Sequence, residues 1–293
     1  MFKEGLLKGK NILITGGGTG LGREIAAKYL ELGAALWICG RRGSVLDSAA
    51  RDLTSKYGGA VRTHAVDVRD AQAVDAMLER IWSESGPLTG LVNNAAGNFI
   101  SPTKDLSANG FNAIANIVFH GTFYVTQGVG KRWIAGGRKG SVISILVTWV
   151  WTGSPFVVPS AMSKAGLHVM TQSLAVEWGR YGIRLNAIAP GPFPTEGATK
   201  RLRPGGRFED DSQMNPMRRV GRMEELQNLA TFLMADGCEW LTGQTVAIDG
   251  AGYLGTGAAA YYLQLDKLTD ADWDKMRAMI KAQNDKDRAG RSA

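Results

Sequence analysis

The chain has 293 residues, of which 44% are hydrophobic, and this is enough to bury one large core or two small ones. Its 34 lysines and arginines exceed its 27 acidic residues, and the resulting net charge of +7 favours polyanionic partners. The sequence contains no helix-turn-helix, zinc or aromatic RNA-binding pattern, so we expect a phosphate-rich small molecule and no nucleic acid.

Neither a secretory leader nor a membrane span is predicted. The first ten residues contain no apolar stretch of signal-peptide length, and the most apolar segment, 142–151, has about half the length that a bilayer span needs. Cys39 and Cys238 form neither a metal-binding set nor a disulfide framework. We therefore expect a soluble protein of a reducing, cytoplasmic compartment, with no bound metal and no membrane contact.

Short apolar runs alternate with amphipathic segments along most of the chain. Strands are predicted at 11–15, 35–39, 60–66, 88–93, 140–147, 184–189 and 245–248. Helices are predicted at 23–32, 71–82, 111–127, 160–178 and 224–234. Strands that alternate with long helices form parallel sheets covered on both faces. We therefore expect an α/β fold, a doubly wound, mainly parallel sheet of the Rossmann type, in a single domain over residues 1–255.

Two segments interrupt this alternation. Residues 192–222 are long, turn-rich and basic, and loops of this kind are usually lids or binding loops, so we expect a substrate lid there. Residues 256–293 form a C-terminal extension that is partly helical. A helix is predicted at 269–281, with Thr269 as its N-cap and Asp272 three residues later.

A glycine-rich segment lies between the first predicted strand and the first predicted helix. Residues 15–22 read Thr-Gly-Gly-Gly-Thr-Gly-Leu-Gly. Glycines at this place let backbone N–H groups approach a pyrophosphate, which the N-terminus of the helix also attracts. A tight turn without a ligand is the alternative. The cofactor-binding residues predicted here are Thr15, Gly16, Gly18, Thr19, Gly20, Leu21 and Gly22.

The end of the second predicted strand favours a 2′-phosphorylated dinucleotide. NAD-dependent enzymes usually carry an acidic residue there for the ribose hydroxyls, but this chain reads Cys-Gly-Arg-Arg over 39–42. Arg41 and Arg42 suit a phosphate, which guanidinium groups bind in bidentate fashion. Two solvated loop arginines are the alternative, and we expect NADP(H) as the cofactor.

Four motifs occur in order along nearly the whole chain: residues 15–22, residues 93–97 (Asn-Asn-Ala-Ala-Gly), Ser160 with Lys164, and residues 190–192 (Pro-Gly-Pro). Together they resemble the short-chain dehydrogenase/reductase family. Asp67 and Val68 match the adenine-contacting pair of that family, although Asp67 could instead be a helix N-cap. The further cofactor contacts that the resemblance implies are Asn94, Ala95, Ala96, Gly97, Lys164, Pro190, Gly191 and Pro192.

A narrower resemblance concerns the active site. In most family members a Tyr stands where this chain has Ser160, and that Tyr is the general acid of carbonyl reduction. Residues 93–102, 156–166 and 189–197 are similar to 2,4-dienoyl-CoA reductases, which also have Ser at that position. The resemblance implies NADPH-dependent reduction of an unsaturated acyl-CoA by a homotetramer. It also implies that Asn98 hydrogen-bonds the thioester carbonyl, that Lys164 holds the nicotinamide ribose and that Ser160 is the active-site serine.

Two positions depart from the dienoyl-CoA reductase pattern. Mitochondrial members use a Tyr eleven residues before the active-site Ser as proton donor, and Trp149 stands there. An indole N–H donates a hydrogen bond but does not transfer a proton near neutral pH. His120 replaces a helix Asn of many members. Histidine titrates near neutral pH, so His120 is a candidate proton donor, and a polar core residue bonded to a backbone carbonyl is the alternative.

Further residues are candidates for substrate contact. Phe99 follows Asn98 within the matched motif, and Trp149, Trp151 and Phe156 follow the fifth predicted strand, where they could line an acyl pocket or pack into the core. Arg201 and Arg203 could bind the phosphates of CoA or simply face solvent.

Two other functions compete with dienoyl-CoA reduction. One is a short-chain reductase that acts on another enoyl or carbonyl substrate, with Trp149 reshaping the pocket. The other is a catalytically silent NADP(H)-binding protein. The absence of both tyrosines supports the silent protein, whereas the presence of Lys164 and Asn98 supports an enzyme.

Overall fold

The strands predicted from the apolar runs form one parallel sheet in the computed structural model. They are β1 (Asn11–Thr15), β2 (Ala35–Gly40), β3 (Val61–Ala65), β4 (Gly90–Asn93), β5 (Gly140–Ile145), β6 (Ile183–Pro190) and β7 (Thr245–Ile248). Their order in the sheet is β3-β2-β1-β4-β5-β6-β7, and every neighbouring pair is parallel. The chain therefore changes direction across the sheet between β1 and β4, and ligands bind outside the carboxyl ends of strands at such a point.

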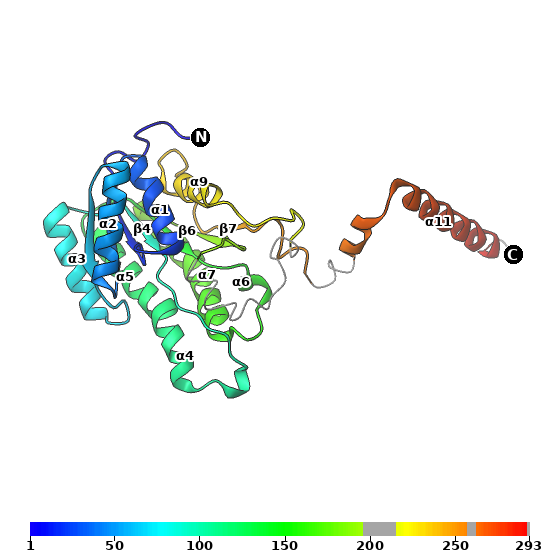
Figure 1. Cartoon of the computed structure of the whole chain (residues 1–293), viewed down its shortest axis with the longest axis horizontal. Helices are drawn as coiled ribbons and strands as arrows, with labels where there is room; N and C mark the ends of the chain where they lie inside the picture. Colours follow the sequence, from blue (N-terminus) through cyan, green and yellow to red (C-terminus); the bar gives the residue numbers. More distant parts are fainter. Residues whose placement is uncertain (196–214, 257–261, 292–293) are drawn as a thin grey trace. The chain divides into compact units, whose positions relative to one another are not determined.

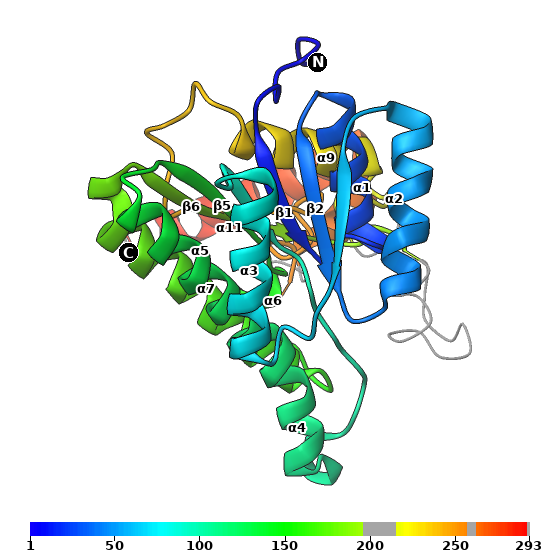
Figure 2. The same cartoon turned by 90° about the vertical axis from the view of Figure 1, so that its left-hand side faces the viewer.

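The structure describes residues 1–195, 215–256 and 262–291. They belong to two compact units, Met1–Tyr253 and Leu254–Ala293. Helices α1 (Gly20–Glu31), α2 (Gly43–Tyr57) and α9 (Met223–Met234) cover one face of the sheet, and α3 (Ala71–Ser85), α5 (Gly121–Ala135) and α7 (Val158–Trp178) cover the other (Figures 1 and 2). The predicted doubly wound α/β fold is confirmed.

Helix α2 is absent from the sequence prediction. Its buried residues are Leu46, Ala49, Ala50 and Leu53, which follow the spacing of one helical face. Short and polar residues separate them, so the stripe is narrow and the segment does not read as a strong helix. The helix packs this stripe against the core that α1 also covers.

The helix predicted at 111–127 is longer and less regular than expected. It begins as α4 (Ala108–Ala115), passes through a π-helical turn η2 (Asn116–His120) and continues as α5. The helix continues past Gly128 and Gly130. Both glycines are needed for close packing, because a Cβ on Gly128 would lie 2.6 Å from Leu78 Cδ1 and a Cβ on Gly130 would overlap the Trp178 ring.

Short elements complete the larger unit. They are the 3₁₀ turns Thr103–Asp105 and Gly179–Tyr181 and the helix α6 (Trp149–Thr152). In the smaller unit, a 3₁₀ segment Leu263–Lys267 precedes α11 (Asp270–Arg291). The predicted cap is present, since the Thr269 hydroxyl donates to Asp272 Oδ2 at 2.7 Å and accepts from the Asp272 backbone N–H at 3.3 Å. The helix continues ten residues beyond the predicted end. Among the described residues, none of the helices has the length and hydropathy that spanning a bilayer requires.

Candidate active site

Hydrogen bonds between Thr15 and Asn94 join the ends of β1 and β4, where the chain changes direction. Thr15 Oγ1 accepts from the backbone N–H groups of Asn94 at 3.0 Å and Ala95 at 2.9 Å. The Asn94 amide donates to the carbonyls of Thr15 at 3.0 Å and Gly16 at 3.2 Å. The loop that leads from β4 to Asn98 is thereby fastened to the glycine-rich turn.

The fold itself requires some of the glycines in the glycine-rich turn, whereas the N-terminus of the helix that follows the turn has no side-chain cap. Gly16 has a φ of 66°, and a Cβ on Gly22 would overlap the Asn94 amide, so both are required by the fold itself. Helix α1 begins at Gly20 with Thr19 as N-cap, but the Thr19 side chain makes no capping hydrogen bond. The N–H groups of the first turn therefore remain available to an anion.

Two exposed arginines follow β2, next to this turn. Within the described residues, neither Arg41 nor Arg42 has a carboxylate at ion-pair distance. Asp67 after β3 is held by Arg69, with Nη2 to Oδ2 at 2.6 Å, and this bond, together with the nearby charge of Arg41, lowers the pKa of Asp67. Asp67 is not the N-cap of α3. That role belongs to Asp70, which accepts from two first-turn N–H groups.

Helix α7 carries Ser160 and Lys164 on one face, one turn apart. Both residues are buried, with 5% and 7% of their surfaces exposed. Lys164 Nζ donates to the carbonyl of Ile145 at the end of β5, and burial lowers the pKa of Lys164 to about 8. No hydrogen bond to the Ser160 hydroxyl occurs in the part of the chain that the structure describes, so this donor is available to a ligand.

Asn98 lies in the loop after β4 and is half-buried. Its Oδ1 accepts from the backbone N–H of Phe99 at 2.9 Å. No described residue accepts a hydrogen bond from Nδ2. Three residues further on, the Ser101 backbone N–H donates to the carbonyl of Phe156 at 2.9 Å, which ties the Asn98 loop to the segment that enters α7.

The predicted aromatic residues have different surroundings. Phe99 is partly buried against a small core of Ile114, Val118, Leu146, Leu167 and Ala187. Trp149 is half-buried at the first position of α6. The Trp151 ring stacks on Tyr253 at a centroid distance of 4.7 Å. Phe156 is 55% exposed, so core packing is the wrong interpretation for that residue.

His120 is exposed at the end of the π-helical turn. Its Nδ1 lies 2.9 Å from Asn116 Oδ1, and its ring contacts are with Phe119 and Tyr124, all on the same helical stretch. The alternative of a polar core residue bonded to a backbone carbonyl is therefore wrong.

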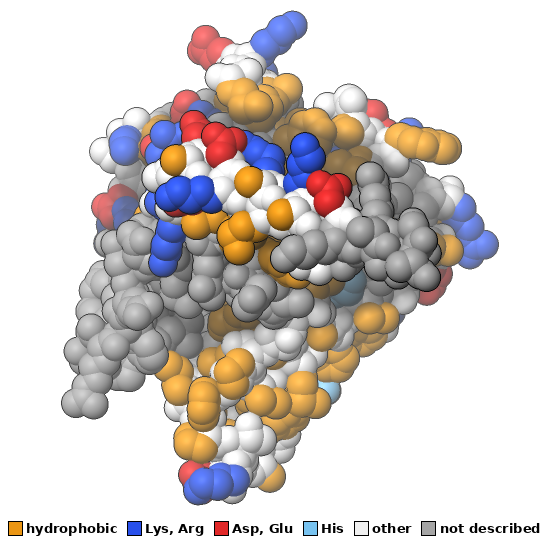
Figure 3. All heavy atoms as spheres, turned by 90° about the vertical axis from the view of Figure 1, so that its right-hand side faces the viewer, with side chains coloured by type: hydrophobic (Ala, Val, Ile, Leu, Met, Phe, Trp, Pro, Cys, Tyr) orange, Lys and Arg blue, Asp and Glu red, His pale blue; other side chains and the backbone are white. Residues whose placement is uncertain are grey.

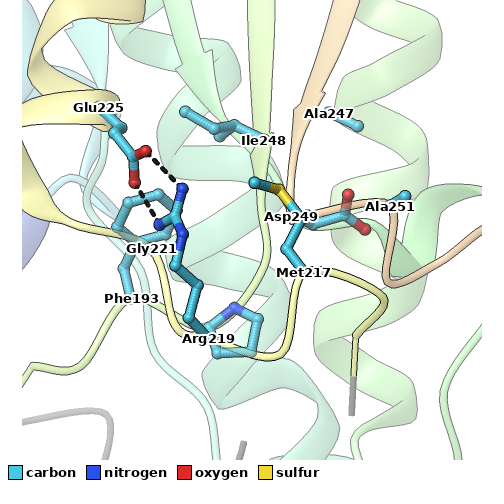
Figure 4. A pocket seen from close by; sticks show the side chains of 11 residues that line it. Phe193, Met217, Arg219, Gly221, Glu225, Ala247, Ile248, Asp249 and Ala251 are labelled. Carbon is cyan, nitrogen blue, oxygen red and sulfur yellow. Dashed lines mark hydrogen bonds and ion pairs between the residues drawn. The ribbon is translucent and has the colours of Figure 1, made fainter. Parts of the chain in front are cut away.

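The motif after β6 forms one wall of a pocket. The Gly191 backbone N–H donates to the Ile248 carbonyl at 3.0 Å, between the ends of β6 and β7. Beyond it lies a pocket of about 280 Å³, and Figure 4 shows the Arg219–Glu225 pair on one side of it and Asp249 on the other. Both described ends of the predicted 192–222 lid contribute to its lining, through Pro192, Phe193, Met217, Arg219 and Gly221. Arg201 and Arg203 lie outside the described residues.

A protein-family model described as enoyl-(acyl carrier protein) reductase matches residues 16–253 of the chain. A solved structure of a short chain dehydrogenase from Bacillus anthracis is 41% identical, with a TM-score of 0.75 over 83% of this chain and 96% of that one. The chain belongs to the short-chain dehydrogenase/reductase family. It is therefore an oxidoreductase of a family that binds a nicotinamide cofactor.

Two further relatives of this short-chain dehydrogenase/reductase are described with a substrate class or a bound nucleotide. A probable 2,4-dienoyl-CoA reductase of Caenorhabditis elegans, described as producing a (3E)-enoyl-CoA, is 43% identical over 254 residues, which is 85% of this chain and 82% of the relative. A gluconate 5-dehydrogenase from Burkholderia cenocepacia, solved in complex with NADP and tartrate, is 29% identical. Its TM-score is 0.80, and the match covers 85% of this chain and 97% of that one.

Sequence reasoning missed one ion pair of this short-chain dehydrogenase/reductase. Arg219 donates to Glu225 through two bonds of 2.7 and 2.8 Å, and the Arg222 backbone N–H adds a third at 2.9 Å. These bonds, chiefly those from Arg219, lower the pKa of Glu225 to about 2. The ion pair therefore stabilises the fold above the ordinary pKa near 4.5, and that stabilisation is lost as pH falls toward 2. Opposite charges six residues apart are the only signal in the sequence.

Proposed function

We propose that this protein is an NADPH-dependent reductase of an unsaturated acyl-CoA thioester, with the chemistry of a 2,4-dienoyl-CoA reductase. The observation that carries the proposal is the pair of available donors, Asn98 Nδ2 and the Ser160 hydroxyl, in two segments that are bonded to each other near the buried Lys164. Donors that are already in place can stabilise a developing negative charge without reorganisation. The curated relative named as a probable 2,4-dienoyl-CoA reductase supports the same substrate class.

The residues around the glycine-rich turn fit a 2′-phosphorylated dinucleotide. The uncapped first turn of α1 offers N–H groups to the pyrophosphate, and Arg41 and Arg42 offer guanidinium groups to the 2′-phosphate. Asp67 and Val68 remain proposed contacts of the adenine, and Asn94 to Gly97 and Pro190 to Pro192 remain proposed contacts of the nicotinamide half. Lys164 would hold the nicotinamide ribose.

The double substitution of Arg41 and Arg42 by alanine should raise the KM for NADPH about 10²-fold and leave the KM for NADH nearly unchanged. Each guanidinium that is lost removes a charge-assisted hydrogen bond, worth about 1.5–3 kcal/mol. Steady-state kinetics with both nucleotides measure the effect. Arg51→Ala, another exposed arginine on α2, is the matched control and should leave both values unchanged. An equal loss with NADPH and NADH would contradict phosphate recognition.

The substrate undergoes two changes that this chain must assist. When bound, NADPH would supply a hydride to the conjugated thioester, and electron density would then move onto the thioester oxygen. Asn98 Nδ2 and Ser160 Oγ donate hydrogen bonds to that oxygen and stabilise the resulting dienolate. The Lys164 ammonium adds a positive charge nearby. A proton must then reach carbon, and the Trp149 indole does not supply it.

His120 is the side chain that we propose as the source of this proton, acting through water. Its exposed ring is open to solvent water, which can relay a proton to the substrate. His120→Ala should lower kcat about tenfold or more and change the pH profile of kcat, since general acid catalysis contributes about 10²–10⁴-fold. Unchanged turnover of His120→Ala at every pH would assign the proton to solvent alone.

A homotetramer is the assembly that we propose. Apolar side chains remain exposed along α7 at Met162, Val169 and Val176, and on the preceding long helix at Phe119 and Phe123. Clusters of this kind usually mark contact surfaces between protein chains.

The proposed function is tested by NADPH oxidation against a panel of dienoyl-CoA, enoyl-CoA and ketoacyl-CoA esters. We expect the dienoyl-CoA esters to give the highest kcat/KM. A higher value with an enoyl or ketoacyl ester would favour a short-chain reductase of another substrate. Tight NADPH binding without turnover of any ester would favour the catalytically silent protein.

A further inference from the structure

Phe156 has a backbone conformation that aromatic residues rarely adopt. Its φ is 63°, in the left-handed region, where the Cβ of any residue other than glycine meets the main chain. Conformations of this kind persist only where surrounding contacts impose them, and they concentrate at functional sites.

A hydrogen bond holds the backbone of Phe156 in its unusual conformation, but no aromatic contact with a described residue holds its ring. The carbonyl accepts from the Ser101 N–H at 2.9 Å, and Val157, the N-cap of α7, follows directly. The ring itself is 55% exposed and makes no aromatic contact with another described residue. Burial of the side chain therefore does not compensate for the unfavourable backbone conformation.

Phe156 belongs to the segment that leads to Ser160, and its carbonyl is bonded to the loop that carries Asn98. Ser101 comes three residues after Asn98, and Phe156 comes four residues before Ser160. Ile100, beside Ser101, is also 38% exposed. Figure 3 shows hydrophobic side chains gathered over the lower part of one face of the molecule. Two exposed apolar side chains, those of Ile100 and Phe156, therefore lie in the segments that carry the proposed oxyanion donors.

We infer that Phe156 determines substrate specificity: its ring contacts the acyl chain of the thioester whose carbonyl Asn98 binds. This inference rests on the proposed function for the orientation of the thioester. The contact leaves the reacting atoms untouched, so it should affect binding of the chain and not the chemical step. Its contribution should grow with chain length, because a longer chain covers more of the ring.

The first experiment measures binding without turnover. Calorimetric titration of the NADP⁺-loaded protein with hexanoyl-CoA and decanoyl-CoA gives the Kd of each ester. We expect Phe156→Ala to raise the Kd for decanoyl-CoA about fivefold to tenfold. This is the loss of affinity expected when about half of the apolar surface of an aromatic side chain no longer contacts the acyl chain. Hexanoyl-CoA should change less than about twofold on the same grounds. Phe232→Ala on α9, which removes a ring that is 44% exposed, is the matched control and should change neither Kd.

Phe156→Gly separates the ring from the backbone. Glycine adopts the left-handed region without a steric penalty, so this variant should have a higher Tm than Phe156→Ala and yet bind decanoyl-CoA as weakly. Wild-type affinity of Phe156→Gly for decanoyl-CoA would overturn the inference. So would an equal loss of affinity for both esters in Phe156→Ala.

A kinetic arm distinguishes failure of the inference from failure of the proposed function. Kinetics with hexadienoyl-CoA and decadienoyl-CoA should show a higher KM for the longer ester alone in Phe156→Ala, with kcat unchanged. If the wild type binds decanoyl-CoA but reduces neither dienoyl ester, the proposed function is wrong, and the titrations still decide the role of the ring. If both esters turn over and the variant keeps the chain-length dependence of the wild type, the inference is wrong and the function stands.

Discussion

Replacing Asn98 by alanine should lower kcat with a dienoyl-CoA ester by about 10²–10³-fold, the loss that follows removal of one oxyanion donor. The Asn98 Nδ2 group is available because no described residue accepts a hydrogen bond from it. Its hydrogen bond should strengthen as charge moves onto the thioester oxygen, so the loss falls on kcat more than on KM. Steady-state kinetics at saturating NADPH measure both constants.

Two measurements make this result specific to the oxyanion. The Kd for NADPH should be unchanged in Asn98→Ala, because the Thr15–Asn94 bonds that order the loop remain. Asn112→Ala, an exposed amide on α4, should leave kcat unchanged. A variant with normal kcat and a raised KM for the ester would mean that Asn98 only binds the substrate and does not stabilise the transition state.

Lys164→Met should reduce kcat/KM for NADPH by about 10²–10³-fold, because it removes both the proposed ribose contact and the positive charge near the proposed oxyanion. Methionine fills a similar apolar space, so the buried site should remain packed. Circular dichroism and the Tm of the variant check that the fold is retained. A loss below about tenfold would mean that Lys164 serves mainly as a hydrogen bond to Ile145.

The pH dependence of kcat/KM shows whether the charge of Lys164, and not only its size, contributes to the reaction. Burial lowers the pKa of Lys164 to about 8, so kcat/KM for NADPH should fall as pH rises through 8, and Lys164→Arg should remove that decline. The effect on stability has the opposite sign. Between pH 8 and the ordinary value of 10.5 the unfolded chain binds more protons, so the free energy of unfolding rises with pH in that window. Lys164→Met should lack this rise.

Local patterns in the sequence were enough to predict the sheet and to place Ser160 and Lys164 on one face of a helix. Most of the strands are nearly continuous apolar runs because helices cover both faces of a parallel sheet, whereas the edge strand β3 is mixed and only partly buried. Ser160 and Lys164 lie one helical turn apart, so their shared face follows from spacing alone. The glycine-rich turn is equally local.

Contacts between distant segments could not be predicted. The Thr15–Asn94 bonds join residues that lie 79 apart in the chain, and the Trp151–Tyr253 stack joins α6 to the chain beyond β7. The sequence offered Asp67 as the N-cap of α3, and only the backbone N–H groups that donate to the Asp70 carboxylate in the structure assign that role to Asp70. The exposure of Phe156 and His120 likewise depends on the tertiary fold.

The Thr15–Asn94 bonds also bear on how fast the nucleotide can be captured. They hold the glycine-rich turn and the loop after β4, the two segments that we propose contact the nucleotide, in one arrangement. A receptor assembled in advance loses little conformational entropy on association, so the binding free energy is not offset by the ordering of these loops. Nucleotide exchange at this part of the crevice should then depend on contacts with the ligand and not on a slow rearrangement of the polypeptide.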